Sequence, residues 1–332
     1  MPSALSTPTH SARIPSLDAM RIIAATMVVC LHSPLPGSDM VQNVVRSLCY
    51  SAVPFFFSVS GYFFYRDAKT AERTLARHTI ARLLRIYVAV MVAYIIIDVI
   101  NYGGLGVMKR EWEYVTPVDF FILNVTPHCP VLWYVHAYIY MLIVTAALGR
   151  WPKVLAALLA VSAIGGMAIG PYRAFAPWMP QISDTNALSC YCFFLTGYFV
   201  RRHNITARLA PKHTAWLAAL TFAAMLMAPA EHAVLHSVSG ESVSGSHYVG
   251  VMLACPLLLL TLLSRPTLLA SLAPLGRGYS MGIYLWHLAV LQCIAVRLTY
   301  DHFLALAPCV FIITLALCHV WKMMRRRLFA AK

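Results

Sequence analysis

Long apolar stretches recur along the whole sequence and limit the folds that it can adopt. Of the 332 residues, 60% are hydrophobic and 11% are charged, whereas a soluble domain carries about a quarter charged residues. About ten stretches approach the length needed to cross a bilayer. Their approximate limits are 17–34, 46–65, 86–105, 131–149, 153–171, 186–200, 213–230, 248–264, 279–299 and 304–322. The sequence therefore predicts an all-α, polytopic membrane protein with about ten transmembrane helices.

The distribution of basic residues predicts how these helices are oriented. An even number of spans places both termini on one side of the membrane. If that side is the cytoplasm, 21 of the 26 Lys and Arg residues are cytoplasmic, which is the bias known as the positive-inside rule. We therefore expect cytoplasmic N- and C-termini. The formal charge of +14 is then explained by topology, and we expect membrane lipid, but no nucleic acid, as a partner.

The same patterns divide the chain into three parts. Residues 1–12 are rich in Ser, Thr and Pro and are predicted to be disordered. Residues 13–324 form the predicted membrane domain, and residues 325–332 form a basic cytoplasmic tail. Most of the nine cysteines lie inside apolar stretches, with no C-x-x-C pair and no histidines at zinc-like spacing. We therefore expect no metal site and no disulfide framework.

The first apolar stretch carries ionisable residues at both ends. Arg21 and His32 are eleven residues apart, which is within about 20° of three helical turns, so they share one face about 16 Å apart. Asp18 precedes Arg21 by three residues and can pair with it. Because burying an ionisable group in a membrane is costly, the pair indicates a functional site. The alternatives are a positive-inside anchor for Arg21 and an interfacial residue for His32.

Further motifs lie in later stretches. In V-P-F-F-F-S-V-S-G-Y, Pro54 is predicted to kink the helix, and Ser58, Ser60 and Gly61 offer a close-packing face. The segment A-R-L-L-R places Arg82 and Arg85 on one helical face at the membrane surface, where they either clamp a phosphate or anchor the helix. Residues 115–128 are semi-apolar and contain two prolines, so we interpret them as an interfacial or re-entrant segment.

A second histidine of interest lies in S-M-G-I-Y-L-W-H. His287 is eight residues into this apolar stretch. A buried histidine in such a place is either functional or a hydrogen-bonded packing residue.

Taken together and in order, the motifs resemble those of a known family. They are L-D-A-M-R followed by ten residues and His32, then V-P-F-F-F-S-V-S-G-Y, A-R-L-L-R, L-W-Y-V-H-A-Y and S-M-G-I-Y-L-W-H. This series resembles the acyltransferase-3 family of bacterial integral membrane acyltransferases, from Ser16 to about Trp321. The compact size is similar to that of the enterobacterial common antigen O-acetyltransferase group. Residues 101–130 and 171–186 match no motif of the family.

The resemblance implies an O-acyltransferase in the bacterial cytoplasmic (inner) membrane. It would move an acyl group, most simply acetyl, from cytoplasmic acetyl-CoA or another acyl-CoA to a hydroxyl of an extracytoplasmic or lipid-linked cell-surface glycan. His32 would then be the general base, and Arg21, held by Asp18, would contact the donor or orient the chain. Arg82 and Arg85 would bind the CoA phosphates. His287 would either orient His32 or stabilise the oxyanion.

Other mechanisms and functions remain open at this point. The acyl group can pass through a covalent acyl-histidine instead of moving directly. A non-catalytic carrier or exporter of a polysaccharide or lipid-linked sugar would use the same residues to line a polar path. A proton-coupled transporter is disfavoured, because Asp98 is the one clearly intramembrane acid in the predicted spans. The sequence predicts nothing about the oligomeric state.

Overall fold

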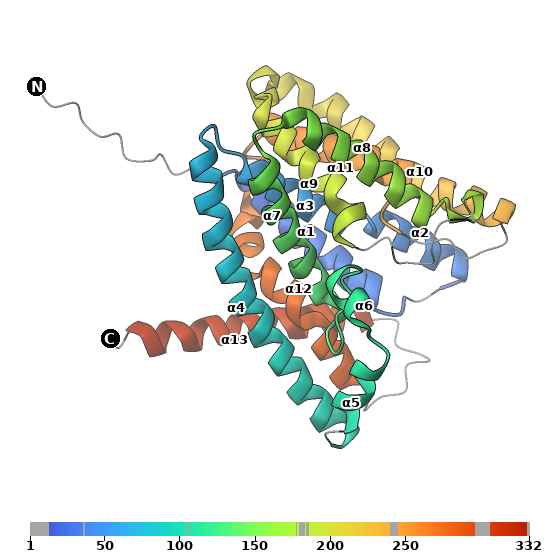
Figure 1. Ribbon diagram of the computed structural model, residues 1–332, viewed down its shortest axis with the longest axis vertical. Helices are drawn as coiled ribbons and strands as arrows, with labels where there is room; N and C mark the ends of the chain where they lie inside the picture. Colours follow the sequence, from blue (N-terminus) through green and yellow to red (C-terminus); the bar gives the residue numbers. More distant parts are fainter. Residues whose placement is uncertain are drawn as a thin grey trace, which may run out of the picture.

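The computed structural model describes residues 13–35, 37–104, 106–176, 178, 183, 186–239, 245–295 and 306–330, and these contain helices but no strand (Figure 1). The α-helices are α1 (Pro15–His32), α2 (Asp39–Cys49), α3 (Ala52–Phe64), α4 (Lys69–Tyr102), α5 (Gly106–Glu113), α6 (Pro117–Phe121), α7 (Trp133–Leu148), α8 (Pro152–Ile169), α9 (Ala187–Arg202), α10 (Thr214–Ser239), α11 (Val249–Ser264), α12 (Ala273–Ala295) and α13 (Leu306–Ala330). Short 3₁₀ helices are η1 (Pro130–Leu132), η2 (Arg173–Phe175), η3 (Ile205–Arg208), η4 (Pro211–His213) and η5 (Ala270–Leu272). The predicted disordered segment 1–12 lies outside the described residues.

Each predicted apolar stretch overlaps a helix of the described chain. Within the residues that the structure describes, seven helical segments are long and apolar enough to cross a membrane, so the chain is a multi-pass membrane protein. They are Pro15–His32, Asp39–Phe64, Lys69–Tyr102, Pro130–Leu148, Pro152–Ile169, Pro211–Ser239 and Leu306–Arg327. The helices α9 and α11 have 16 residues each, a rise of about 24 Å that is less than the hydrocarbon thickness. The count of about ten spans therefore stays a prediction.

The contact between α3 and α9 uses the small residues noted in the sequence. A methyl group added to Gly61 would lie 1.9 Å from the carbonyl oxygen of Phe194, so the helices approach at a distance that only glycine permits. One turn earlier, Ser58 Oγ donates a hydrogen bond to the carbonyl oxygen of Phe193 at 2.9 Å. The predicted close-packing face is thus confirmed at Ser58 and Gly61.

The second predicted span covers the end of α2 and all of α3, with an interruption between the two helices. The α-helical hydrogen-bond pattern is interrupted at Tyr50 and Ser51, between α2 and α3, although both residues keep right-handed helical backbone angles. Pro54 is the third residue of α3. Pro54 has no N–H to donate to the carbonyl of residue 50, so the interruption lies where the predicted proline kink would fall.

The C-terminal helix extends further than the sequence patterns indicated. α13 continues to Ala330 and so includes residues 325–330 of the predicted basic tail, while residues 331 and 332 lie outside the described residues. In Figure 1 the C-terminal end of α13 projects beyond the other helices.

The uneven distribution of basic residues makes the topology testable. We expect reporter fusions after Lys69, Arg202 and Lys332 to report the cytoplasm, because basic loops are retained on that side. Fusions near Asp39 and Glu111 should report the outside. Paired phosphatase and fluorescent-protein fusions measure both compartments. An external signal after Arg202 would contradict the predicted span count and orientation.

Candidate active site

α1 and α12 lie side by side and carry ionisable residues towards both ends. A methyl group on Gly276 would lie 1.7 Å from the carbonyl oxygen of Asp18, so glycine is needed where the two helices meet. Further along both helices, the ring centroids of His32 and His287 are 5.2 Å apart. The two helices therefore run in the same direction. Their arginine-containing end and their histidine-containing end are separated by about 16 Å, the rise along α1 from Arg21 to His32.

A cavity of about 690 Å³ lies at the arginine end, and we call it the arginine cavity. Its wall includes five arginines and a single acid, Asp18. Hydroxyl-bearing, aromatic and aliphatic side chains line the rest, and the positive charge favours a ligand with several negative charges. Its polar and aromatic lining residues include Arg13, Arg21, Arg66, Arg82, Arg277, Asp18, Ser60, Ser280, Phe63, Tyr134, Tyr138 and Tyr284.

Asp18 and Arg21 form the ion pair that their spacing predicts. Arg21 Nη1 donates to Asp18 Oδ1 at 2.7 Å, and the Arg21 guanidinium lies 5.9 Å from the centre of the Phe63 ring. Asp18 is buried, whereas the Arg21 side chain is 30% exposed. The carboxylate therefore fixes one edge of the guanidinium and leaves its other N–H groups available to a ligand in the cavity.

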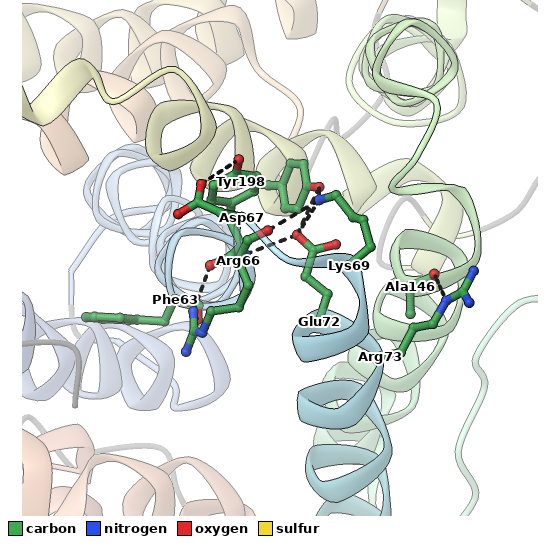
Figure 2. Close-up of polar contacts among 9 residues, drawn as sticks. Phe63, Arg66, Asp67, Lys69, Glu72, Arg73, Ala146 and Tyr198 are labelled. Atoms are coloured by element: carbon green, nitrogen blue, oxygen red, sulfur yellow. Dashed lines mark hydrogen bonds and ion pairs between the residues drawn. The ribbon is translucent and has the colours of Figure 1, made fainter. Parts of the chain in front are cut away.

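The turn between α3 and α4 holds Arg66 at the cavity. Its Nη1 donates to the carbonyl oxygens of Phe63 and Tyr65, both at 2.7 Å. Figure 2 shows that the guanidinium folds back toward Phe63 while the Arg66 backbone faces Glu72. The local backbone thereby fixes the direction of the side chain.

A buried carboxylate braces the same turn from the other side (Figure 2). Glu72 Oε1 accepts hydrogen bonds from Lys69 Nζ at 2.8 Å, from the Arg66 backbone N–H at 3.1 Å and from Tyr198 Oη at 3.2 Å. Lys69 Nζ also donates to Tyr198 Oη at 3.1 Å. Because Tyr198 belongs to α9, this cluster ties the start of α4 to α9 and keeps Arg66 in place.

The structure separates the two residues of the A-R-L-L-R motif. Arg82 lines the arginine cavity, but Arg85 does not. Arg85 Nε instead donates to the carbonyl oxygen of Ala81 at 3.1 Å, within its own helix. Residues at positions i and i+3 of a helix differ by only about 60° around its axis, but the edge of the cavity passes between Arg82 and Arg85. Of the two predicted phosphate-binding residues, the structure thus brings only Arg82 into the cavity.

The histidine end combines an exposed ring with a buried one. His32 is exposed at the end of α1, whereas His287 is fully buried. His287 Nδ1 lies 3.0 Å and 2.9 Å from the carbonyl oxygens of Ile283 and Tyr284. A carbonyl oxygen only accepts, so Nδ1 carries the proton and Nε2 of the neutral ring is an acceptor. This buried Nε2 has no hydrogen-bond partner among the described residues.

Aromatic side chains connect the two ends. Tyr284 lines the arginine cavity, and its ring centroid lies 6.4 Å from that of His287. The Tyr134 ring, also on the cavity wall, lies 5.2 Å from Tyr284. His32 is not part of that wall, but it is reached through His287. No group of three His, Cys, Asp or Glu side chains able to hold a metal ion occurs in the described part of the chain.

Three cavity arginines were not expected from the sequence to be functional, namely Arg13, Arg66 and Arg277. Each had been explained by membrane topology. The sequence feature that indicates a role for two of them is their proximity to a motif. Arg66 ends the segment S-G-Y-F-F-Y-R, and Arg277 precedes S-M-G-I-Y-L-W-H.

Comparison with known proteins agrees with a membrane acyltransferase. Residues 14–320 match the acyltransferase-3 family model, described as "Acyltransferase domain". The match covers most of the chain, so the chain belongs to the acyltransferase-3 family. No curated protein and no solved structure matches it.

Proposed function

We propose that this protein is an O-acyltransferase of the bacterial cytoplasmic membrane. It transfers an acyl group, most simply acetyl, from cytoplasmic acyl-CoA to a hydroxyl of an extracytoplasmic or lipid-linked glycan. The observation that carries the proposal is the pairing of α1 with α12, which joins a five-arginine cavity to two adjacent histidines. A polyanionic donor needs a positively charged site such as the arginine cavity, whereas an uncharged hydroxyl acceptor needs a base such as the histidine pair. The compact size supports a relationship to the enterobacterial common antigen O-acetyltransferase group.

The arginine cavity suits the donor. Guanidinium groups bind phosphate through paired hydrogen bonds, and CoA carries several phosphate charges. In the predicted topology, Arg13, Arg66 and Arg277 face the cytoplasm, where acyl-CoA is made. The pantetheine arm would follow the aromatic wall formed by Tyr134 and Tyr284 toward the histidine pair.

The histidine pair suits base catalysis. His32 takes the proton of the acceptor hydroxyl, and the hydroxyl oxygen attacks the thioester carbonyl carbon. The new C–O bond replaces the C–S bond, and the departing CoA sulfur takes the proton back from the imidazolium. His32 is the reachable member of the pair, because His287 is fully buried.

The protonation of His287 favours an orienting role. A neutral ring whose Nδ1–H is directed at carbonyl oxygens has no second N–H for an oxyanion. Its free Nε2 can instead accept an N–H of His32 and leave the other His32 nitrogen free to act as the base. The positive charge of Arg46 on α2 acts on the same site and would favour a developing oxyanion.

Donor consumption distinguishes a transferase from a carrier. We expect purified protein in proteoliposomes to release one free CoA for each acyl group that appears on the glycan, since transfer breaks one thioester per ester formed. Mass spectrometry of surface glycans from cells with and without the gene then identifies the mass increment that is lost. Glycan movement across the vesicle membrane without CoA release would contradict transfer and favour the carrier.

A further inference from the structure

A second cavity, which the proposed reaction leaves unexplained, lies between α4 and α12. Its volume is about 920 Å³, and the C-terminal parts of α4 and α12, the end of α5 and residues 114–130 enclose it. We call it the α4–α12 cavity. Its lining includes Tyr102, Arg110, Glu111, Tyr114, Leu291 and Gln292.

A buried carboxylate fixes one wall of this cavity. Asp98 Oδ2 lies 2.6 Å from Nδ1 of His128, whose side chain is fully buried, and Asp98 Oδ1 accepts a hydrogen bond from Gln292 Nε2. Asp98 itself is 4% exposed. The carboxylate therefore sets the orientation of the Gln292 amide, and the amide oxygen Oε1 remains available as an acceptor.

The loop that supplies His128 is held in an uncommon conformation. His128 and Asn124 have φ angles of 62° and 60°, in the left-handed region that side chains other than glycine rarely adopt. Asn124 Oδ1 accepts a hydrogen bond from the Ala187 backbone N–H at 3.0 Å, which ties the loop to α9. Nε2 of His128 is buried without a hydrogen-bond partner among the described residues. Uncommon backbone conformations and buried polar atoms without a partner are found preferentially at functional sites.

The charges on the wall distinguish this cavity from the arginine cavity. Arg110 is balanced by the adjacent Glu111, and the Asp98 carboxylate is paired with His128. Five arginines against one acid line the arginine cavity, by comparison. Planar hydrogen-bonding groups and tyrosine rings without an excess of positive charge suit a neutral ligand that carries many hydroxyls.

The position of the cavity relates it to the histidine pair. Leu291, which lines the cavity, follows His287 by four residues, or about 6 Å along α12 and about 40° around it. Gln292 lies about 140° around the helix from His287. The cavity wall therefore includes Leu291, one helical turn beyond His287 on α12, and Gln292, on another face of that helix.

We propose that the α4–α12 cavity binds a neutral sugar unit of the acceptor glycan, next to the unit that is acylated. Gln292 Oε1, Glu111 and Arg110 hydrogen-bond its hydroxyls, and Tyr114 packs against the ring. Asp98 and His128 are positioning residues, because they act through Gln292. The identity of the ligand as the acceptor rests on the proposed function.

Binding measured without donor tests this site separately from catalysis. The probes are methyl β-glucopyranoside, methyl N-acetyl-β-glucosaminide and CoA, observed by saturation-transfer NMR on the full chain in a detergent that has no sugar headgroup. We expect a signal from at least one glycoside. Gln292→Ala and Asp98→Asn should weaken its binding by about fivefold or more, the effect of one lost hydrogen bond. The CoA signal should persist in both variants, which also shows that they are folded.

Two further variants complete the test. Tyr114 is 80% exposed, so Tyr114→Ala removes a ring from the cavity wall with little effect on folding, and it should also weaken the glycoside signal. Glu113→Gln, at an exposed residue outside the wall, should leave that signal unchanged. The site is excluded if neither glycoside gives a signal while CoA does, or if Gln292→Ala binds like wild type. The test measures binding and no acyl transfer. A protein that binds the glycoside but transfers no acyl group would therefore contradict the proposed reaction and not this binding site.

Discussion

Replacing His32 by alanine is expected to lower the rate of acyl transfer by about 10²–10⁴-fold, the usual contribution of a general base. The exposed His32 ring lies beside the buried His287 ring, which presents an unpartnered nitrogen and has no free N–H of its own. The variant removes the proton acceptor but little packing, because His32 is exposed at the end of α1. The measurement is CoA release by purified wild-type and variant protein at matched expression and thermal stability.

An unrelated exposed histidine serves as the control for His32. His78 lies on α4 outside both cavities, so His78→Ala should retain wild-type activity. His287→Ala should reduce the rate less than His32→Ala if His287 only orients its neighbour. Activity of His32→Ala within about threefold of wild type, far from the loss expected of a missing base, would remove His32 from the mechanism. The carrier would then be the better hypothesis.

The features predicted correctly from the sequence are those encoded within one helix. Apolar length alone predicts where the helices lie, because a membrane span must satisfy its own backbone hydrogen bonds. The Asp18–Arg21 pair follows from spacing of three residues, and the close approach at Gly61 follows from the absence of a side chain. The interruption before Pro54 follows from the missing N–H of proline, which cannot donate to the carbonyl four residues earlier.

The features that escaped prediction depend on which helices become neighbours. Asp98 and Gln292 are far apart in the sequence, yet they meet across a helix contact, and the proximity of His32 and His287 followed only from the family resemblance. No periodicity within a single segment indicates such a meeting. Arg82 and Arg85 are a second example. The sequence predicts that they share a helical face, but it does not predict that only Arg82 lines the cavity.

Arg82→Ala is expected to raise the KM for acyl-CoA by about 10–100-fold. A hydrogen bond to a charged group contributes about 1.5–3 kcal/mol, and each 1.4 kcal/mol corresponds to a factor of ten. Arg82 lines the arginine cavity, where in the proposed reaction its guanidinium contacts a donor phosphate. Initial rates at varied acetyl-CoA concentration measure the effect, and membrane insertion is monitored in parallel.

Arg85→Ala is the matched control, because it removes the same charge from the same helix one turn away. Arg85 donates to the Ala81 carbonyl and does not line the cavity, so its replacement should change the donor KM by less than about threefold, as for a surface charge. An equal rise in both variants would mean that the general positive field attracts the donor, without direct contact. Impaired insertion in both, with an unchanged KM, would identify the two arginines as topological anchors. Acetyl-dephospho-CoA, which lacks one phosphate, refines the assignment: a smaller effect of Arg82→Ala with this donor would place the 3′-phosphate at Arg82, because the contact is then already absent.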